Sequence, residues 1–65
     1  MYAVDEVDLA GNRYTIHTGT FEHCCAMYCV AKQHRPSHEH LICNPDRVDV
    51  GLQDGLTEEE REMLP

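Results

Sequence analysis

Apolar and polar residues alternate with a period of two in the first part of the chain. In residues 13–18, a polar side chain separates each apolar side chain from the next, which is typical of a strand with one buried face. Residues 2–9 carry a second apolar set, whose parity changes between Val4 and Val7. We therefore expect antiparallel strands at 2–9 and 13–18, with a bulge in their register and a tight Gly-Asn turn at positions 11 and 12.

Helical spacing replaces this alternation from residue 20 onwards. The apolar residues then recur as they do on the buried face of a helix, at Phe21, Cys24, Cys25, Tyr28 and Ala31. Thr20 is a suitable N-cap, and Pro36 cannot continue a helix. These signals predict a helix over residues 20–35.

Two further extended segments follow the predicted helix. Residues 38–43 have the composition of a third strand, in which Leu41 and Cys43 share one parity and are expected to face inward. Residues 47–52 alternate again, with valines at 48 and 50 and a leucine at 52. The Asn-Pro-Asp sequence between the two segments is typical of a type I turn. We expect strands over 38–43 and 47–52.

The last part of the chain carries a helix-start signal. Thr57 and Glu60 have the Thr-x-x-Glu spacing of a capping box, which predicts a short helix over residues 57–64. The predicted order is thus ββαββ followed by a short C-terminal helix. The central helix must cover one face of the antiparallel sheet, because no other element can do so. We predict one small α+β domain over residues 1–65.

The net charge of −7 narrows the choice of partners. Twelve acidic residues stand against five basic ones, the wrong sign for direct binding of nucleic acid. The charge sums to −2 over residues 1–19, to zero over 20–45 and to −5 over 46–65, so a basic protein surface should be attracted chiefly to the two ends of the chain. The candidate partner-binding residues are Asp46, Asp49, Asp54, Glu58, Glu59, Glu60 and Glu62. The alternative is that these carboxylates only keep a small protein soluble.

Nothing in the sequence resembles a targeting or membrane-spanning segment. The first residues lack the basic and apolar regions of a signal peptide, and no run of 18 apolar residues occurs. We expect a cytoplasmic protein that makes no contact with a membrane. Its four cysteines should then be thiols or metal ligands rather than disulfides.

All four cysteines and all five histidines fall between residues 17 and 43. Zinc needs about four thiolate or imidazole ligands, and one candidate set combines Cys25 and Cys29 on the predicted helix with the His-x3-His pair His34 and His38. Against this set, the chain has no Cys-x2-Cys pair. The interpretation we favour is that the helical cysteines are small apolar residues packed between helix and sheet, with no cofactor bound.

Three histidines share the parity expected of the exposed sheet face, namely His17, His38 and His40. If the second and third strands were neighbours, these imidazoles would form a cluster able to bind a metal or to titrate near pH 6. The alternative is that they are scattered surface histidines.

The sequence contains few residues or motifs that indicate a catalytic site. Cys24 and Cys25 lie just beyond the first turn of the predicted helix, where the helix dipole lowers a thiol pKa only slightly. The chain has no Cys-x-x-Cys motif, no Gly-x-Ser-x-Gly elbow and no phosphate-binding glycine loop. We do not expect an enzyme.

The leading hypothesis is therefore a non-catalytic protein-interaction module that docks an acidic surface on a basic partner. Compact acidic chains of this size are the kind of inhibitor that phages and mobile elements use against nucleic-acid machinery, because carboxylates can occupy a phosphate-binding surface. The second hypothesis is a zinc-stapled Cys/His binding domain. A homodimer fits both hypotheses.

Overall fold

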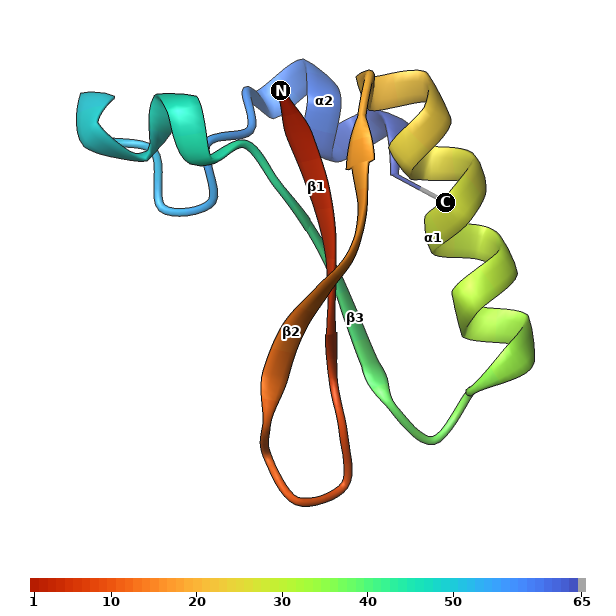
Figure 1. Ribbon diagram of the computed structural model, residues 1–65. Helices are drawn as coiled ribbons and strands as arrows, with labels where there is room; N and C mark the ends of the chain where they lie inside the picture. Colours follow the sequence, from red (N-terminus) through yellow and green to blue (C-terminus); the bar gives the residue numbers. More distant parts are fainter. Residues whose placement is uncertain (65) are drawn as a thin grey trace.

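The computed structural model describes residues 1–64. Three strands, one long helix and two short helical segments follow each other along this chain (Figure 1). Their bounds are β1 Tyr2–Val7, β2 Arg13–Gly19, α1 Phe21–His34, β3 Glu39–Cys43, the 3₁₀ helix η1 Pro45–Val50, and α2 Glu58–Met63. The fold is α+β, as the sequence predicts, but it has three strands rather than four.

The sheet is antiparallel with the order β2-β1-β3, so β1 is the central strand. The predicted irregularity in its register is present. Val4 pairs with His17 and Asp5 pairs with Thr15, which leaves Ile16 of β2 as the extra residue of a bulge. Because Ile16 packs on the core and His17 contacts α1, both side chains of the bulge reach the helix side of the sheet.

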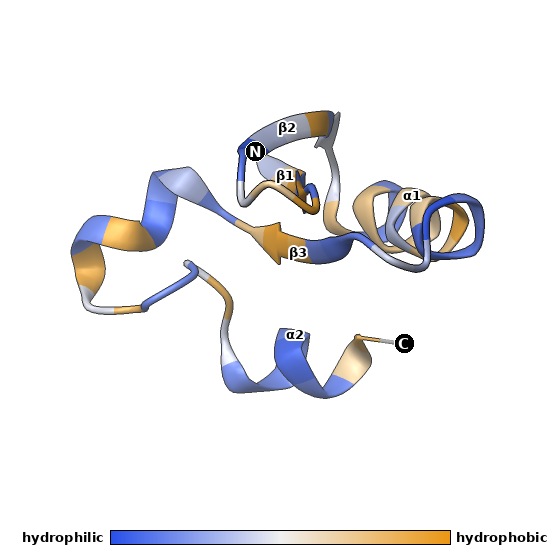
Figure 2. Cartoon of the chain, turned by 90° about the horizontal axis from the view of Figure 1, so that it is seen from below, coloured by the Kyte–Doolittle hydropathy of each residue, from blue (hydrophilic) through white to orange (hydrophobic). Residues whose placement is uncertain are grey.

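The core lies between one face of the sheet and α1. Val4, Cys24, Ile42 and Leu56 are buried there together, each with at most 4% of its surface exposed. Leu56 brings the C-terminal segment to the same face, since it packs against β1 and β3 residues. Figure 2 shows α1 on one side of the three strands and α2 below β3. The other sheet face therefore has no α-helix over it in the part of the chain that is described.

Local capping signals predict the helix boundaries well. The Thr20 side chain accepts a hydrogen bond from the His23 N–H, and α1 ends at His34 with Arg35 as its C-cap. Thr57 and Glu60 form the predicted capping box of α2.

Among residues 1–64, no helix has the length and apolar character needed to cross a membrane.

The predicted strand over residues 47–52 is wrong, because residues 47–50 belong to the 3₁₀ helix η1. The Asn44 side chain accepts a hydrogen bond from the Asp46 N–H, Pro45 occupies the first turn, and Gly51 ends the helix with a left-handed backbone (φ 89°). Val48 and Val50 alternate in the sequence, but they are 44% and 72% exposed. These local caps therefore outweigh the alternation, and the segment pairs with neither edge strand of the sheet, β2 or β3.

The hairpin turn also differs from the prediction, since β1 ends at Val7 rather than at residue 9. The Asp8 carboxylate accepts hydrogen bonds from the backbone N–H groups of Ala10 and Asn12, at 3.0 and 2.9 Å. Of the predicted Gly-Asn pair, Gly11 alone has a positive φ, 86°. The strands are thus joined by a loop organised around an aspartate rather than by a two-residue turn.

The parity predicted for β3 is wrong as well. Val4 pairs with Ile42 and Glu6 pairs with His40, so Ile42 and His40 face α1. Leu41 and Cys43 lie on the opposite face, where both are half-buried. The inversion has a physical cause, because His40 reaches a buried carboxylate on β1 and is 7% exposed.

Candidate functional site

The most unusual group of the fold is a carboxylate in the middle of the central strand. Glu6 of β1 has no exposed surface. Its Oε1 accepts hydrogen bonds from Nε of Arg35 at 2.8 Å and from Nε2 of His40 at 2.9 Å. Its Oε2 accepts one from the Tyr14 hydroxyl and lies 3.3 Å from Nδ1 of His38. Four groups thus occupy the four lone-pair sites of one carboxylate.

These contacts keep Glu6 ionised. Hydrogen bonds from Tyr14 and Arg35 lower the pKa of its carboxyl well below the usual value, and they outweigh the opposing effect of burial. Because the carboxylate is an acceptor only, His40 must carry its proton on Nε2. With every acceptor site filled, Glu6 has none left for a substrate proton or a metal ion. Its role in this geometry is to join β1, β2, β3 and the end of α1.

A second carboxylate occupies the opposite face of the sheet, because neighbouring residues of a strand point to opposite sides. Asp5 is 8% exposed and accepts hydrogen bonds from Nε of Arg13 and from the Thr15 hydroxyl, both at 2.8 Å. The Cys43 sulfur lies 4.0 Å from it. Asp5 is therefore balanced by an arginine, as Glu6 is.

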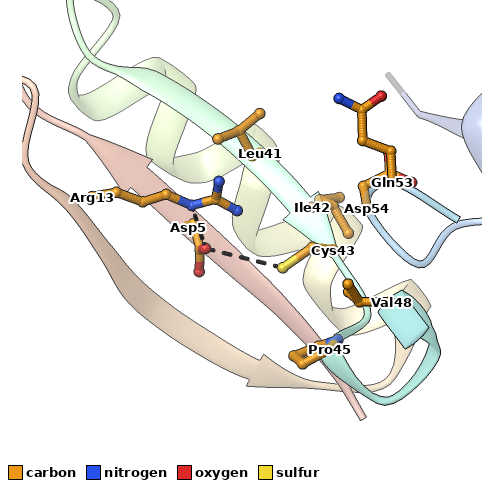
Figure 3. A pocket seen from close by; sticks show the side chains of 9 residues that line it. All are labelled: Asp5, Arg13, Leu41, Ile42, Cys43, Pro45, Val48, Gln53 and Asp54. Atoms are coloured by element: carbon orange, nitrogen blue, oxygen red, sulfur yellow. Dashed lines mark hydrogen bonds and ion pairs between the residues drawn. The ribbon is translucent and has the colours of Figure 1, made fainter. Parts of the chain in front are cut away.

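A hollow of about 470 Å³ opens beside this ion pair (Figure 3). Figure 3 shows the Arg13 guanidinium over Asp5, with Leu41 and Cys43 also on this face and α1 behind the sheet. Burial raises the pKa of the Cys43 thiol, so the hollow holds a weakly reactive sulfur. Its two carboxylates, Asp5 and Asp54, are each paired with an arginine. The hollow therefore offers neither an uncompensated charge nor an activated nucleophile.

Three of the seven predicted partner-binding carboxylates are used inside the molecule. Asp54 lies 2.9 Å from Arg61, and Glu60 lies 2.9 Å from Arg47 while it also completes the capping box of α2. Asp46 lies 2.5 Å from the N-terminal amine. Asp54 and Glu60 are poor candidates for a partner contact, because each is held by an arginine, whereas the ion pair of Asp46 is exposed on both sides.

The other four predicted carboxylates, Asp49, Glu58, Glu59 and Glu62, are exposed and have no ion-pair partner among residues 1–64. Three of them lie on α2, where residues three and four positions apart are neighbours. Figure 2 shows α2 as hydrophilic along most of its length. The structure thus separates an exposed acidic group, here called the free carboxylates, from the internally paired ones.

The candidate zinc ligands do not converge. Residues 1–64 contain no group of three or more His, Cys, Asp or Glu side chains arranged to hold a metal ion. Cys25 and Cys29 are half-buried on α1, and Cys25 packs against the core. His34 is exposed, whereas His38 is turned towards Glu6. Zinc therefore stays a prediction without support from this arrangement.

The cluster of three imidazoles, which required the second and third strands to be neighbours, does not form. β1 lies between β2 and β3, so the strands of His17 and His40 are not neighbours. His38 and His40 are gathered around Glu6 instead. His17 packs against His23 of α1, with ring centroids 4.4 Å apart.

The helical thiols behave as core groups rather than as nucleophiles. Cys24 has no exposed surface, as expected for a small apolar residue between helix and sheet. Burial raises the pKa of both Cys24 and Cys25. This direction is the opposite of the one that activates a cysteine.

Sequence reasoning missed the two carboxylates of β1. Asp5 and Glu6 are flanked by Val4 and Val7, and the change of apolar parity between the valines marks the place where both faces of the strand are covered. That change is a bulge signal in the sequence, but the partners of the two acids lie 8 to 34 residues away along the chain.

Comparisons with known protein families, with curated proteins and with solved structures give no match to this chain.

Proposed function

We propose that this protein is a small, non-catalytic interaction module that binds a basic, nucleic-acid-binding surface of another protein and thereby inhibits it. The observation that carries the proposal is the group of free carboxylates, Asp49, Glu58, Glu59 and Glu62. They are exposed, and no cation of the described chain is paired with them.

The ion pairs of the C-terminal segment support this proposal. Arg47 and Arg61 are the only basic residues after position 35, and each is held by an internal carboxylate at 2.9 Å. Both arginines thus form their ion pairs with carboxylates outside the free group, and of the two only Arg61 also attracts a free carboxylate, Glu58. A negative surface of this kind raises the rate of encounter with a positive one and repels nucleic acid.

The carboxylates of α2 also have a suitable spacing. Glu59 and Glu62 are three residues apart and Glu58 and Glu62 are four apart, so the three side chains can face one partner surface together. Such a row can compete with phosphates for the same lysine and arginine side chains. Binding and nucleic acid should therefore exclude each other.

Neutralising two of these residues should weaken partner binding. We expect the double variant Glu59→Gln, Glu62→Gln to lose about tenfold in affinity at low ionic strength, because two exposed charge contacts are removed. The partner is isolated by affinity capture from a nuclease-treated lysate of the source cells and purified. Binding is then measured by isothermal titration calorimetry at several salt concentrations, with a double-stranded DNA fragment as competitor.

The matched control is the double variant Glu22→Gln, Glu39→Gln, which makes the same change of net charge at exposed positions on α1 and β3. It should bind like the unchanged protein. The proposal fails if both double variants bind equally well, or if DNA does not displace the captured partner. It also fails if the affinity for the captured partner does not fall as the salt concentration rises.

A further inference from the structure

His17 and His23 bring two imidazole rings together where β2 ends and α1 begins. Their ring centroids are 4.4 Å apart, with an angle of 72° between the ring planes. His17 lies on the strand and His23 in the first turn of the helix, so the pair bridges two elements. This contact is separate from the free carboxylates and from the Glu6 network.

The ring nitrogens border a common space beside Gly19. A Cβ atom placed on Gly19 would lie 3.5 Å from Nε2 of His17 and 3.7 Å from Nδ1 of His23. Glycine lacks this atom, so no side chain of residue 19 stands between the two nitrogens. Any larger residue at position 19 would occupy it.

Nε2 of His17 is the second observation that points to a ligand. This nitrogen is buried and has no hydrogen-bond partner among the residues that the structure describes. Buried polar atoms are nearly always paired, with protein, water or an ion. Packing of the two rings alone leaves this atom unexplained.

The spacing of the rings is near that of two imidazoles that share one ion. Metal–nitrogen distances of about 2.1 Å and an angle near 90° or slightly more place the ring centroids about 4.5 to 5 Å apart. The observed 4.4 Å lies just below this range, so a small movement of the exposed His23 ring brings both nitrogens to one ion. His23 is exposed, so an ion can enter from solvent.

We propose that His17 and His23 bind a divalent late transition metal ion such as Ni²⁺ or Zn²⁺, and that this ion joins β2 to α1. Imidazole is a preferred ligand of these ions, whereas Mg²⁺ and Ca²⁺ prefer oxygen ligands. Residues 1–64 gather no third His, Cys, Asp or Glu ligand at any one place. The protein therefore supplies two ligands and water supplies the others.

Titration of the full chain with NiCl₂ or ZnCl₂ tests this site. We expect one ion per chain at pH 7.5 by isothermal titration calorimetry and no binding of MgCl₂. The variant His23→Gln should bind at least about tenfold more weakly, because a two-ligand site loses half of its protein ligands. His23 is exposed, so this variant should keep the fold.

Two controls separate this site from other metal-binding groups. His34→Gln changes an exposed histidine in the last turn of the same helix and should bind like the unchanged protein. The double variant Cys25→Ser, Cys29→Ser removes the other candidate ligands of α1 and should also keep the affinity. The site is refuted if His23→Gln binds with unchanged affinity, or if the cysteine variant loses the ion instead.

Nuclear magnetic resonance locates the ion independently of affinity. Substoichiometric Ni²⁺ is paramagnetic, so it should broaden the backbone amide signals of residues 17–23 before those of β3. Broadening centred on Cys29 or His34 would overturn the proposal. The result does not depend on the acidic partner, so it stands or falls separately from the proposed function.

Discussion

Replacing Gly55 with alanine is expected to remove most of the stability of this small domain. Gly55 is buried and has a left-handed backbone, with φ of 77°. A Cβ atom at this position would lie 2.0 Å from the carbonyl oxygen of Asn44, a separation that no rotation of a side chain can relieve. The Asn44 N–H donates to the carbonyl of Asp54 at 2.8 Å, so the clash falls on the contact that places Leu56 in the core.

The expected loss is about 4 kcal/mol in the free energy of unfolding. Left-handed backbone costs an alanine about 1–2 kcal/mol, and forced overpacking adds about 1–3 kcal/mol. A domain of this size has only about 5 kcal/mol or slightly more in total. The measurement is urea denaturation followed by circular dichroism, compared through the midpoint and the slope.

Gly51 provides a matched control for this variant. Its φ is 89°, close to that of Gly55, but a Cβ atom there would meet nothing within 4 Å. Gly51→Ala should therefore carry the backbone cost alone, about 1–2 kcal/mol. Equal losses in the two variants would show that the contact with Asn44 is not important for stability.

The parts of the fold that the sequence predicts correctly are those with local causes. The Thr20 cap, the Thr57–Glu60 capping box and the end of α1 before Pro36 all depend on residues within four positions of each other. The bulge was predicted from a change of parity inside one segment. Interactions of this range leave a direct trace in the residue pattern.

The predicted fourth strand shows where a pattern misleads. Alternating valines are typical of a strand, but the caps of η1 at Asn44 and Gly51 are also local and point to a helix. A strand needs a neighbour, and the segment pairs with neither edge strand of the sheet, β2 or β3. The sequence contains both signals, and only the three-dimensional arrangement decides between them.

The inverted face of β3 has a longer-range cause. The sequence suggests that the apolar residues Leu41 and Cys43 face inward and that His40, of the other parity, faces outward. Here His40 faces inward because Glu6, 34 residues earlier, is buried opposite it. A partnership over this distance leaves no periodic signal in a single sequence.

The ion pairs of the arginines explain the character of the surface. All four arginines are paired with carboxylates of the described chain: Arg13 with Asp5, Arg35 with Glu6, Arg47 with Glu60 and Arg61 with Asp54. Two of these pairs stabilise the sheet and two hold the C-terminal segment. The fold thus uses its arginines internally, and the excess of acidic residues is left at the surface for the proposed partner.

Replacing Glu6 with glutamine should destabilise the protein more than any other removal of a single charge. Glutamine has nearly the same shape, but it cannot accept four hydrogen bonds, and it leaves the buried side chain of His40 without its anionic partner. We expect the melting temperature at pH 7 to fall by about 10 °C or more. Glu39→Gln, the same chemical change at an exposed residue of β3, should shift it by no more than about 2 °C.

The pH dependence of stability provides a test that is specific to the charge of Glu6. Its pKa is lower in the folded protein than in the unfolded chain, where it is about 4.3. The resulting stability is therefore fully present above about pH 5 and is lost as the pH falls towards the folded-state pKa. Glu6→Gln should flatten the acid limb of the stability profile between about pH 5 and pH 2. Some slope should remain, because Asp8, Asp54 and Glu60 also have lowered pKa values. If Glu6→Gln melts at the same temperature as the unchanged protein and loses stability in acid just as steeply, the Glu6 network does not hold the sheet together.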